Sequence, residues 1–195
     1  MVLASQSPRR IRMFEEQRIA VRIIPADIEE EQLPEESPVD FVRRMCGEKA
    51  MTVAAALSRA GETPFVVAAD TIVVLNRQIL GKPTDRAHAK AMLQQLSGNS
   101  HTVITGWTIG KMGEAWTVSH CETRVTFHAL SEAEIDAYIA TGDADDKAGA
   151  YAIQGLGGYL VSEVAGDFYN VVGLPISQVV RSLIQRGALK GFLHE

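Results

Sequence analysis

The sequence predicts an α/β protein in which helices flank a mixed, twisted sheet and two lobes surround a central cleft. The chain opens as β-α-β, because residues 2–5 and 19–24 are typical of strands on either side of a helix that begins at Pro8. Two long predicted strands, residues 101–110 and 115–127, are joined by a short turn that contains glycine. The chain lacks the steady βαβ alternation of a doubly wound sheet, so we expect parallel and antiparallel strands together.

The bulk composition is that of an ordinary globular protein and excludes several classes. The 195 residues, of which 46% are hydrophobic and 22% charged, suit one domain of two lobes over residues 1–195. A net charge of −5 disfavours a general nucleic-acid-binding protein. No segment resembles a membrane span or a signal peptide, and Cys46 and Cys121 form no CxxC motif. We therefore expect a cytoplasmic protein with reduced thiols, no membrane partner and no nucleic-acid partner.

The first distinctive stretch follows the first strand, at residues 3–10. Ser7 is a good helix N-cap and Pro8 fits the first helical position, which predicts a helix to about Gln17. Arg9 and Arg10 then lie in the first turn. Two interpretations remain open: a capped surface helix with solvated arginines, or a phosphate-binding cradle at a helix start.

An acidic segment, residues 25–36, precedes the longest predicted helix, residues 38–60. Most of the acids are expected to be solvated, although one or two could reach a metal ion if the segment folds over a site. Ser37 and Asp40 form a strong helix start. Lys49 lies within the apolar stripe of this helix. Its ammonium group either extends along the edge of the core or points into a cleft, and we favour the cleft.

Asp70 is the most unusual charge in the chain. It interrupts the apolar residues 65–75, which predict a central strand. A carboxylate buried alone is costly, so Asp70 must be protonated, paired or bound to a metal. The alternative is a purely structural role, in which the Asp70 carboxylate bonds to a nearby loop. We favour a functional role for Asp70.

The remaining elements follow from local signals. Asn76 and Arg77 predict a turn, and Gly81-Lys82-Pro83 a tight loop. Helices are predicted from a Thr84 cap to Leu96, from the Ser131 capping box to Thr141, and from Ile176 to a Gly187 cap, with a strand at residues 159–164.

The second distinctive stretch is residues 146–158, which are rich in glycine. Glycines allow a backbone to approach a ligand closely. The stretch also carries Lys147, Tyr151 and Gln154, which are not typical of a flexible linker. A carboxamide such as that of Gln154 both donates and accepts, which suits the edge of a nucleobase.

Several cations and one buried acid in a net-acidic protein indicate a pocket for a small, highly charged anion, and a triphosphate fits best. The chain has neither a P-loop motif nor a G-x-G-x-x-G turn. It also shows no Ser/His/Asp elbow and no partner for thiol catalysis.

Five motifs, taken together and in order, resemble those of the Maf family of nucleoside triphosphate pyrophosphatases. They are Leu3-Ala4-Ser5-x-Ser7-Pro8-Arg9-Arg10, Ala69-Asp70-Thr71, Gly81-Lys82-Pro83, residues 146–155 and Val172-Gly173-Leu174-Pro175. The resemblance covers nearly the whole chain. It implies an inosine triphosphatase-like architecture, a homodimer, and cleavage between the α and β phosphates with Mg²⁺ or Mn²⁺.

The resemblance also implies roles for individual residues. Asp70 is the proton acceptor, and Glu30 and Asp70 are the metal ligands, with Glu29 and Glu31 as open alternatives to Glu30. The substrate-binding residues are Ser7, Arg9, Arg10, Lys49, Thr71, Lys82, Lys147 and Gln154.

The stretches around Arg9, Asp70 and residues 147–154 look like the dTTP/UTP type within that family. The expected activity is therefore hydrolysis of dTTP and UTP, or modified pyrimidine nucleotides, to the monophosphate and pyrophosphate. Two alternatives remain: a 7-methyl-GTP type of pyrophosphatase, and a nucleotide-binding regulator of cell division with little hydrolysis.

Overall fold

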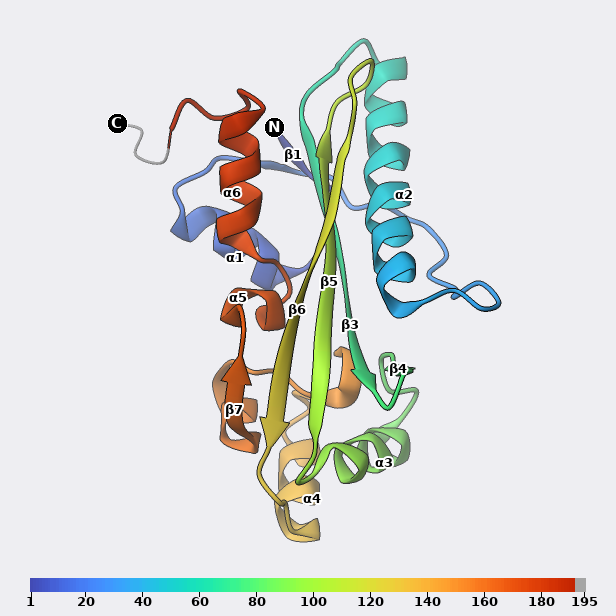
Figure 1. Ribbon diagram of the computed structural model, residues 1–195, viewed down its shortest axis with the longest axis vertical. Helices are drawn as coiled ribbons and strands as arrows, with labels where there is room; N and C mark the ends of the chain where they lie inside the picture. Colours follow the sequence, from blue (N-terminus) through green and yellow to red (C-terminus); the bar gives the residue numbers. More distant parts are fainter. Residues whose placement is uncertain (192–195) are drawn as a thin grey trace. The chain divides into compact units, whose positions relative to one another are not determined.

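The computed structural model describes residues 1–191 and shows a mixed α/β protein (Figure 1). The strands are β1 (Val2–Leu3), β2 (Arg22–Ile23), β3 (Val66–Leu75), β4 (Gln78–Leu80), β5 (Ser100–Gly110), β6 (Thr117–Phe127) and β7 (Val161–Ala165). The α-helices are α1 (Pro8–Glu16), α2 (Pro38–Arg59), α3 (Arg86–Leu96), α4 (Glu132–Ala140), α5 (Phe168–Val172) and α6 (Ile176–Gln185). Two 3-10 helices are η1 (Ala148–Ala150) and η2 (Gly155–Leu160).

The seven strands form one mixed sheet in the order β2-β1-β3-β5-β6-β7, with β4 paired to β3. β1 is parallel to both β2 and β3, whereas the β3–β4 and β6–β7 pairs are antiparallel. The predicted mixed sheet with flanking helices is therefore confirmed. The short first strand is inserted between two others, which buries Val2 and Leu3 completely.

The chain forms two compact units. The first contains Met1–Asp70, Thr105–Cys121 and the residues from Gly173 onward, and the second contains Thr71–Ile104 and Glu122–Val172. β3, β5 and β6 contribute residues to both units. The predicted cleft between two lobes stays a prediction.

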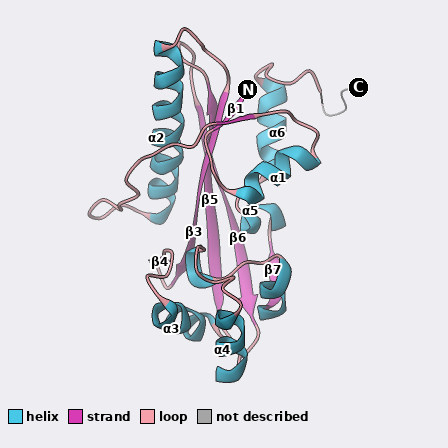
Figure 2. Cartoon of the chain, turned by 180° about the vertical axis from the view of Figure 1, so that it is seen from behind, coloured by secondary structure: helices cyan, strands magenta, loops and turns pink. Residues whose placement is uncertain are grey.

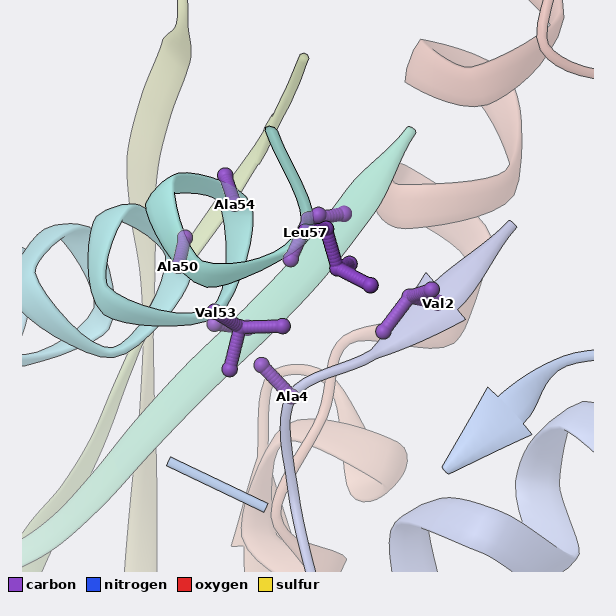
Figure 3. Packing of buried hydrophobic residues seen from close by; sticks show 8 residues of the cluster. Val2, Ala4, Ala50, Val53, Ala54 and Leu57 are labelled. Carbon is purple, nitrogen blue, oxygen red and sulfur yellow. The ribbon is translucent and has the colours of Figure 1, made fainter. Parts of the chain in front are cut away.

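The core of the first unit lies between α2 and the strands β1 and β3 (Figure 3). Its buried residues are Val2, Ala4, Ala50, Val53, Ala54, Leu57, Val66 and Ala68. Half of these are alanines, which bring the helix close to the sheet. Gly106 on β5 makes an equally close approach, because a Cβ atom there would overlap the carbonyl group of Val42 on α2.

α2 begins as the sequence predicts. The Ser37 side chain accepts a hydrogen bond from the Asp40 amide, and Pro38 occupies the first turn. The capping box of α4, formed by Ser131 and Glu134, is likewise confirmed. Local signals are sufficient at these two helix starts, because the cap and its partner lie within one turn.

Four local predictions need correction. Asp85 rather than Thr84 caps α3, because its carboxylate accepts from the His88 amide at 2.7 Å. Tyr159 lies in η2, since Gly155 adopts a φ of +70° and turns the chain before β7 begins. The strands predicted at 2–5 and 19–24 shorten to two residues each, although the amides of Ala4 and Ile24 still donate to the neighbouring strands. The short helix α5 is absent from the prediction.

Candidate active site

Asp70 lies in the middle of β3 and its side chain is only 9% exposed. The strand continues through it without interruption, from Val66 to Leu75. Its carboxylate Oδ1 accepts from the Lys49 ammonium group at 2.6 Å. Of the three options for a buried acid, the structure therefore shows the paired one.

Lys49 extends from α2 and is nearly as buried as Asp70, with 11% of its side chain exposed. Its Nζ atom also lies 2.6 Å from Oε1 of Glu30, in the segment between β2 and α2. One ammonium group thus joins two carboxylates from separate parts of the chain. The contact identifies Glu30 as the residue of the acidic segment that pairs beside Asp70.

Arg10 faces inward. Its guanidinium donates to the carbonyl oxygens of Ala69 and Gly173, both at 2.8 Å, and to Ser5 Oγ at 3.4 Å. Burial lowers the pKa of Arg10, and the nearby Asp70 carboxylate opposes that shift. Arg10 thus ties α1 to the backbone beside Asp70. Ser5 is not among the predicted site residues, because the helix-start signal in the sequence points to Ser7 instead.

Ser7 and Arg9 have fewer internal contacts. Ser7 is the N-cap residue of α1, yet its side chain makes no capping bond, and its amide donates to Ser5 Oγ. Arg9 is half-buried and forms no ion pair or hydrogen bond within residues 1–191. Both side chains can therefore bind a ligand without breaking an existing bond.

Cys46 lies close to these charges but is unsuited to catalysis. It is fully buried, and burial, reinforced by Asp70, raises the pKa of its thiol to about 12. The group is protonated at neutral pH and is not a nucleophile. Both cysteines are unbridged, as predicted.

The other predicted substrate-binding residues belong to the second unit. The Gly149 amide donates to the Gly81 carbonyl at 3.0 Å, so the loops that carry Lys147 and Lys82 lie side by side. Gly149 adopts a φ of +68°, and a Cβ atom there would lie 3.0 Å from Val73. Only glycine meets both requirements.

The side chains on these loops differ in their environment. Lys82 and Gln154 are exposed, and Thr71 is half-buried. Lys147 is paired with Asp143 at 3.2 Å and Asp146 at 2.7 Å, so its charge is already compensated. No helical spacing indicates this pairing in the sequence, because residues 141–147 form turns and a bend after α4 ends.

Aromatic hydroxyls support the same loop. Tyr151 and His101 Nε2 form a hydrogen bond of 2.7 Å, and their rings meet edge to face with Phe127. The Tyr138 hydroxyl accepts from the Ala152 amide and donates to Asp143. Gln154 is thus exposed on a loop whose flanking residues are anchored.

The comparisons with known proteins agree with these motifs. The model of a family described as Maf-like protein matches residues 1–186. The chain belongs to the Maf family. A Maf relative from Citrifermentans bemidjiense, named dTTP/UTP pyrophosphatase, is 46% identical over 190 residues, covering 97% of this chain and 96% of the relative.

Further relatives carry the same name. The Geobacter sulfurreducens protein is 44% identical over 97% of both chains, and the Halalkalibacterium halodurans protein 44% identical over 96% of both. A solved nucleoside-triphosphatase / dITP/XTP pyrophosphatase from Mycobacterium abscessus aligns over 96% of this chain and 94% of its own. It is 12% identical with a TM-score of 0.43, which is too low to support an argument.

The donor chemistry around Lys49 bears on the divalent cation that the resemblance implies. Two hard carboxylate oxygens, from Glu30 and Asp70, each lie 2.6 Å from the Lys49 ammonium group. Residues 1–191 contain no cluster of three or more His, Cys, Asp or Glu side chains suited to a metal ion. Mg²⁺ is commonly bound by one or two carboxylates, with water and substrate phosphates as the other ligands. The residues fit that mode of binding.

No helix within the described chain is both long and apolar enough to cross a bilayer.

Proposed function

We propose that this chain is a nucleoside triphosphate pyrophosphatase that hydrolyses dTTP and UTP to the monophosphate and pyrophosphate. The observation that carries the proposal is the contact of buried Lys49 with buried Asp70 and half-exposed Glu30, in a chain of the Maf family. The names of relatives at about 45% identity support the choice of nucleotide.

Asp70 is the proposed general base. Its carboxylate is held on a rigid central strand and orients or deprotonates the water that attacks the α-phosphorus. The bond from the α-phosphorus to the bridging oxygen breaks, and pyrophosphate leaves. A bound Mg²⁺ or Mn²⁺ would be held by Glu30 and Asp70 and would offset the negative charge that develops on the phosphates.

Lys49 holds the two carboxylates close together by placing its ammonium group within 2.6 Å of each. Arg9 and Lys82 are the proposed ligands of the triphosphate, together with Ser7 at the start of α1. Arg10 and Lys147 are also proposed substrate-binding residues. Arg10 already bonds to the Ala69 carbonyl, and Lys147 to the Asp146 carboxylate.

Thr71 and Gln154 are the proposed contacts to the base. The carboxamide of Gln154 can donate to a carbonyl and accept from the N–H of a uracil or thymine edge. We also propose a homodimer in the cytoplasm, acting on a free nucleotide and not on nucleic acid, in keeping with the net charge of −5.

A nucleotide panel tests this function. Pyrophosphate release is measured with dTTP, UTP, CTP, GTP and 7-methyl-GTP, with and without Mg²⁺ or Mn²⁺. The expected result is metal-dependent turnover that is fastest with dTTP and UTP. A preference for GTP or 7-methyl-GTP would contradict the assigned substrate. Nucleotide binding without turnover would favour the regulator.

A further inference from the structure

We infer that Arg44 is a positioning residue that holds the acidic segment 25–36 against α2, so that Glu30 stays opposite Asp70. The inference rests on the proposed function, in which Glu30 and Asp70 hold a divalent cation. Arg44 itself bonds to neither Asp70 nor Lys49 within residues 1–191 and acts through the segment.

The segment has no regular secondary structure (Figure 2). It is also largely exposed. Glu30 itself has 47% of its side chain exposed. A carboxylate on such a segment samples many positions unless its backbone is fixed. The Lys49 ion pair fixes the side chain, but an ion pair of a half-exposed partner contributes little by itself.

Arg44 supplies a backbone restraint close to Glu30. Its Nη2 atom donates to the carbonyl oxygen of Glu31 at 2.8 Å, one residue beyond Glu30. Its Nε and Nη2 atoms also bind the Glu36 carboxylate at 2.6 and 2.7 Å, in the bidentate geometry that arginine favours. One guanidinium therefore holds both ends of the stretch 31–36.

The stretch between those two ends is a closed turn. The Glu36 carboxylate accepts from the Leu33 amide at 3.0 Å, and the Glu36 carbonyl accepts from Gln32 Nε2 at 2.7 Å. Glu35 adopts a φ of +59°, which completes the turn. These bonds hold the turn closed, so Glu36 and Glu31 are joined through a short, internally bonded stretch.

The spacing along α2 matches this arrangement. Arg44 and Lys49 are five residues apart, or roughly 7.5 Å along the helix axis. Arg44 binds Glu31 and Glu36, and Lys49 binds Glu30, so the segment is attached to the same helix at two points. The Lys49 contact places the Glu30 carboxylate, and the Arg44 contacts keep the backbone next to Glu30 in position.

The charges support a lasting contact. The hydrogen bonds with Arg44 lower the pKa of Glu36, and those with Glu36 raise the pKa of Arg44. Both groups therefore remain ionised across the neutral range. The Glu36 side chain is only 8% exposed, so water competes weakly for the pair.

The test uses Arg44→Met, which keeps the stem but loses the guanidinium, and Arg44→Lys, which keeps the charge but loses the two-pronged bond. Glu48→Gln is the matched control. It removes the negative charge that lies 3.2 Å from Arg44 Nη1 but leaves the Glu31 and Glu36 contacts in place.

The first measurement needs no substrate. A Glu-specific endoproteinase is added to the folded full-length chain, and cleavage within residues 25–36 is followed. Arg44→Met is expected to be cleaved faster than the parent chain, Arg44→Lys at an intermediate rate, and Glu48→Gln at the parent rate. Thermal unfolding confirms that each variant is folded. If Arg44→Met does not fold, Arg44→Lys is compared with the parent chain instead.

The second measurement is Mn²⁺ binding, followed by the electron paramagnetic resonance signal of free Mn²⁺. The dissociation constant of Arg44→Met is expected to rise at least about tenfold, as when a metal ligand loses its outer support. kcat for dTTP at saturating Mn²⁺ is expected to change little. Faster cleavage with unchanged Mn²⁺ affinity would overturn the inference, and so would unchanged cleavage.

The two proposals fail in different ways. If the parent chain hydrolyses no nucleotide, the proposed function fails, while cleavage and Mn²⁺ binding still decide the role of Arg44. If the parent chain turns over dTTP and Arg44→Met matches it in both measurements, only the role of Arg44 fails.

Discussion

Lys49 and Asp70 form a buried ion pair across 2.6 Å, between the longest helix and the central strand of the sheet. Removing one partner of such a pair leaves an uncompensated charge in a place that water hardly reaches. The Glu30 carboxylate also pairs with Lys49, so loss of Asp70 leaves the Lys49 charge partly compensated. The pair is therefore both a structural contact and the centre of the proposed chemistry.

Asp70→Asn is expected to lower kcat by about 10²–10⁴, the range that general base catalysis contributes. The variant is expected to stay folded because Glu30 still pairs with Lys49, and to lose less than the roughly 3–5 kcal/mol of a fully broken buried pair. Pyrophosphate release and urea unfolding measure the two effects. Asp136→Asn, at the exposed Lys90 pair, is the control and is expected to match the parent chain. Near-parental hydrolysis by Asp70→Asn would exclude Asp70 as the base.

Arg9 and Arg10 are adjacent, yet their substitutions are expected to differ in kind. Arg9→Ala is expected to raise KM for dTTP while changing the free energy of unfolding by less than about 0.5 kcal/mol, as at most surface sites. Arg10→Met removes the bonds to the Ala69 and Gly173 carbonyls. It is expected to lower the free energy of unfolding by roughly 2–3 kcal/mol.

Arg12→Ala is the control for both arginines, because its pairing with Glu16 on α1 is exposed. Urea unfolding and steady-state kinetics are compared for the three variants. If neither Arg9→Ala nor Arg10→Met changed kcat/KM, α1 would be only a capped helix and not a phosphate cradle.

Gln154→Leu is expected to weaken base selection without destabilising the protein, because the side chain is exposed on an anchored loop. Loss of a two-point contact to a base edge reduces discrimination by about 1–3 kcal/mol. The measurement is the ratio of kcat/KM for dTTP to that for CTP. Gln94→Leu, also exposed and in the second unit, is the control. An unchanged ratio in Gln154→Leu would remove Gln154 from base recognition.

His101 makes stability depend on pH. Burial lowers the pKa of His101 from its usual 6.5 to about 4, so between these values the unfolded chain binds more protons than the folded one. The free energy of unfolding therefore falls as pH decreases from 6.5 to 4, by up to roughly 3 kcal/mol at 1.36 kcal/mol per pH unit. Above pH 6.5 this contribution is constant.

Urea unfolding between pH 4 and pH 7 measures the effect. His101→Phe is expected to lose this part of the slope, because no imidazole remains to be protonated. His128→Gln is the control, since His128 is exposed, and it is expected to keep the slope. Equal slopes in the parent chain and His101→Phe would show that other groups cause the dependence.

Two glycines are expected to respond oppositely to alanine. Gly106→Ala drives a methyl group into the Val42 carbonyl and is expected to destabilise the protein by about 1–3 kcal/mol or more. A methyl group added at Gly47, on α2, would meet no atom within 4 Å. Gly47→Ala is expected to stabilise the protein by roughly 0.5–1 kcal/mol through helix propensity. Thermal unfolding of both variants measures the difference, and equal midpoints would contradict the close packing of β5 on α2.

Local signals predict much of the fold. The starts of α2 and α4 and the turn at Asn76 and Arg77 are as expected, because each depends on residues within a few positions of one another. The local predictions that are wrong are those in which a competing neighbouring residue sets where the element begins. Asp85 competes with Thr84 for the same cap, and Gly155 turns the chain before Tyr159 can join a strand.

The candidate site shows the same division. Its polar residues could be selected from the sequence, because a charge within an apolar run, as at Asp70 and Lys49, requires a partner. The partner itself could not be selected, since Glu29, Glu30 and Glu31 are equivalent in the sequence. The course of the segment across α2, held at Arg44, decides in favour of Glu30.

The sequence by itself determined most of the element types, the order of the motifs, the residues that carry charge into the core and the Maf resemblance. These depend on periodicity and on local chemistry. Only the tertiary structure decided that Arg10 faces the backbone while Arg9 does not, and that Lys49 joins Glu30 to Asp70. The Arg10 contact with Gly173 spans 163 residues of chain. Packing of helices on the sheet fixes such distant pairs, and no local pattern in the sequence encodes them.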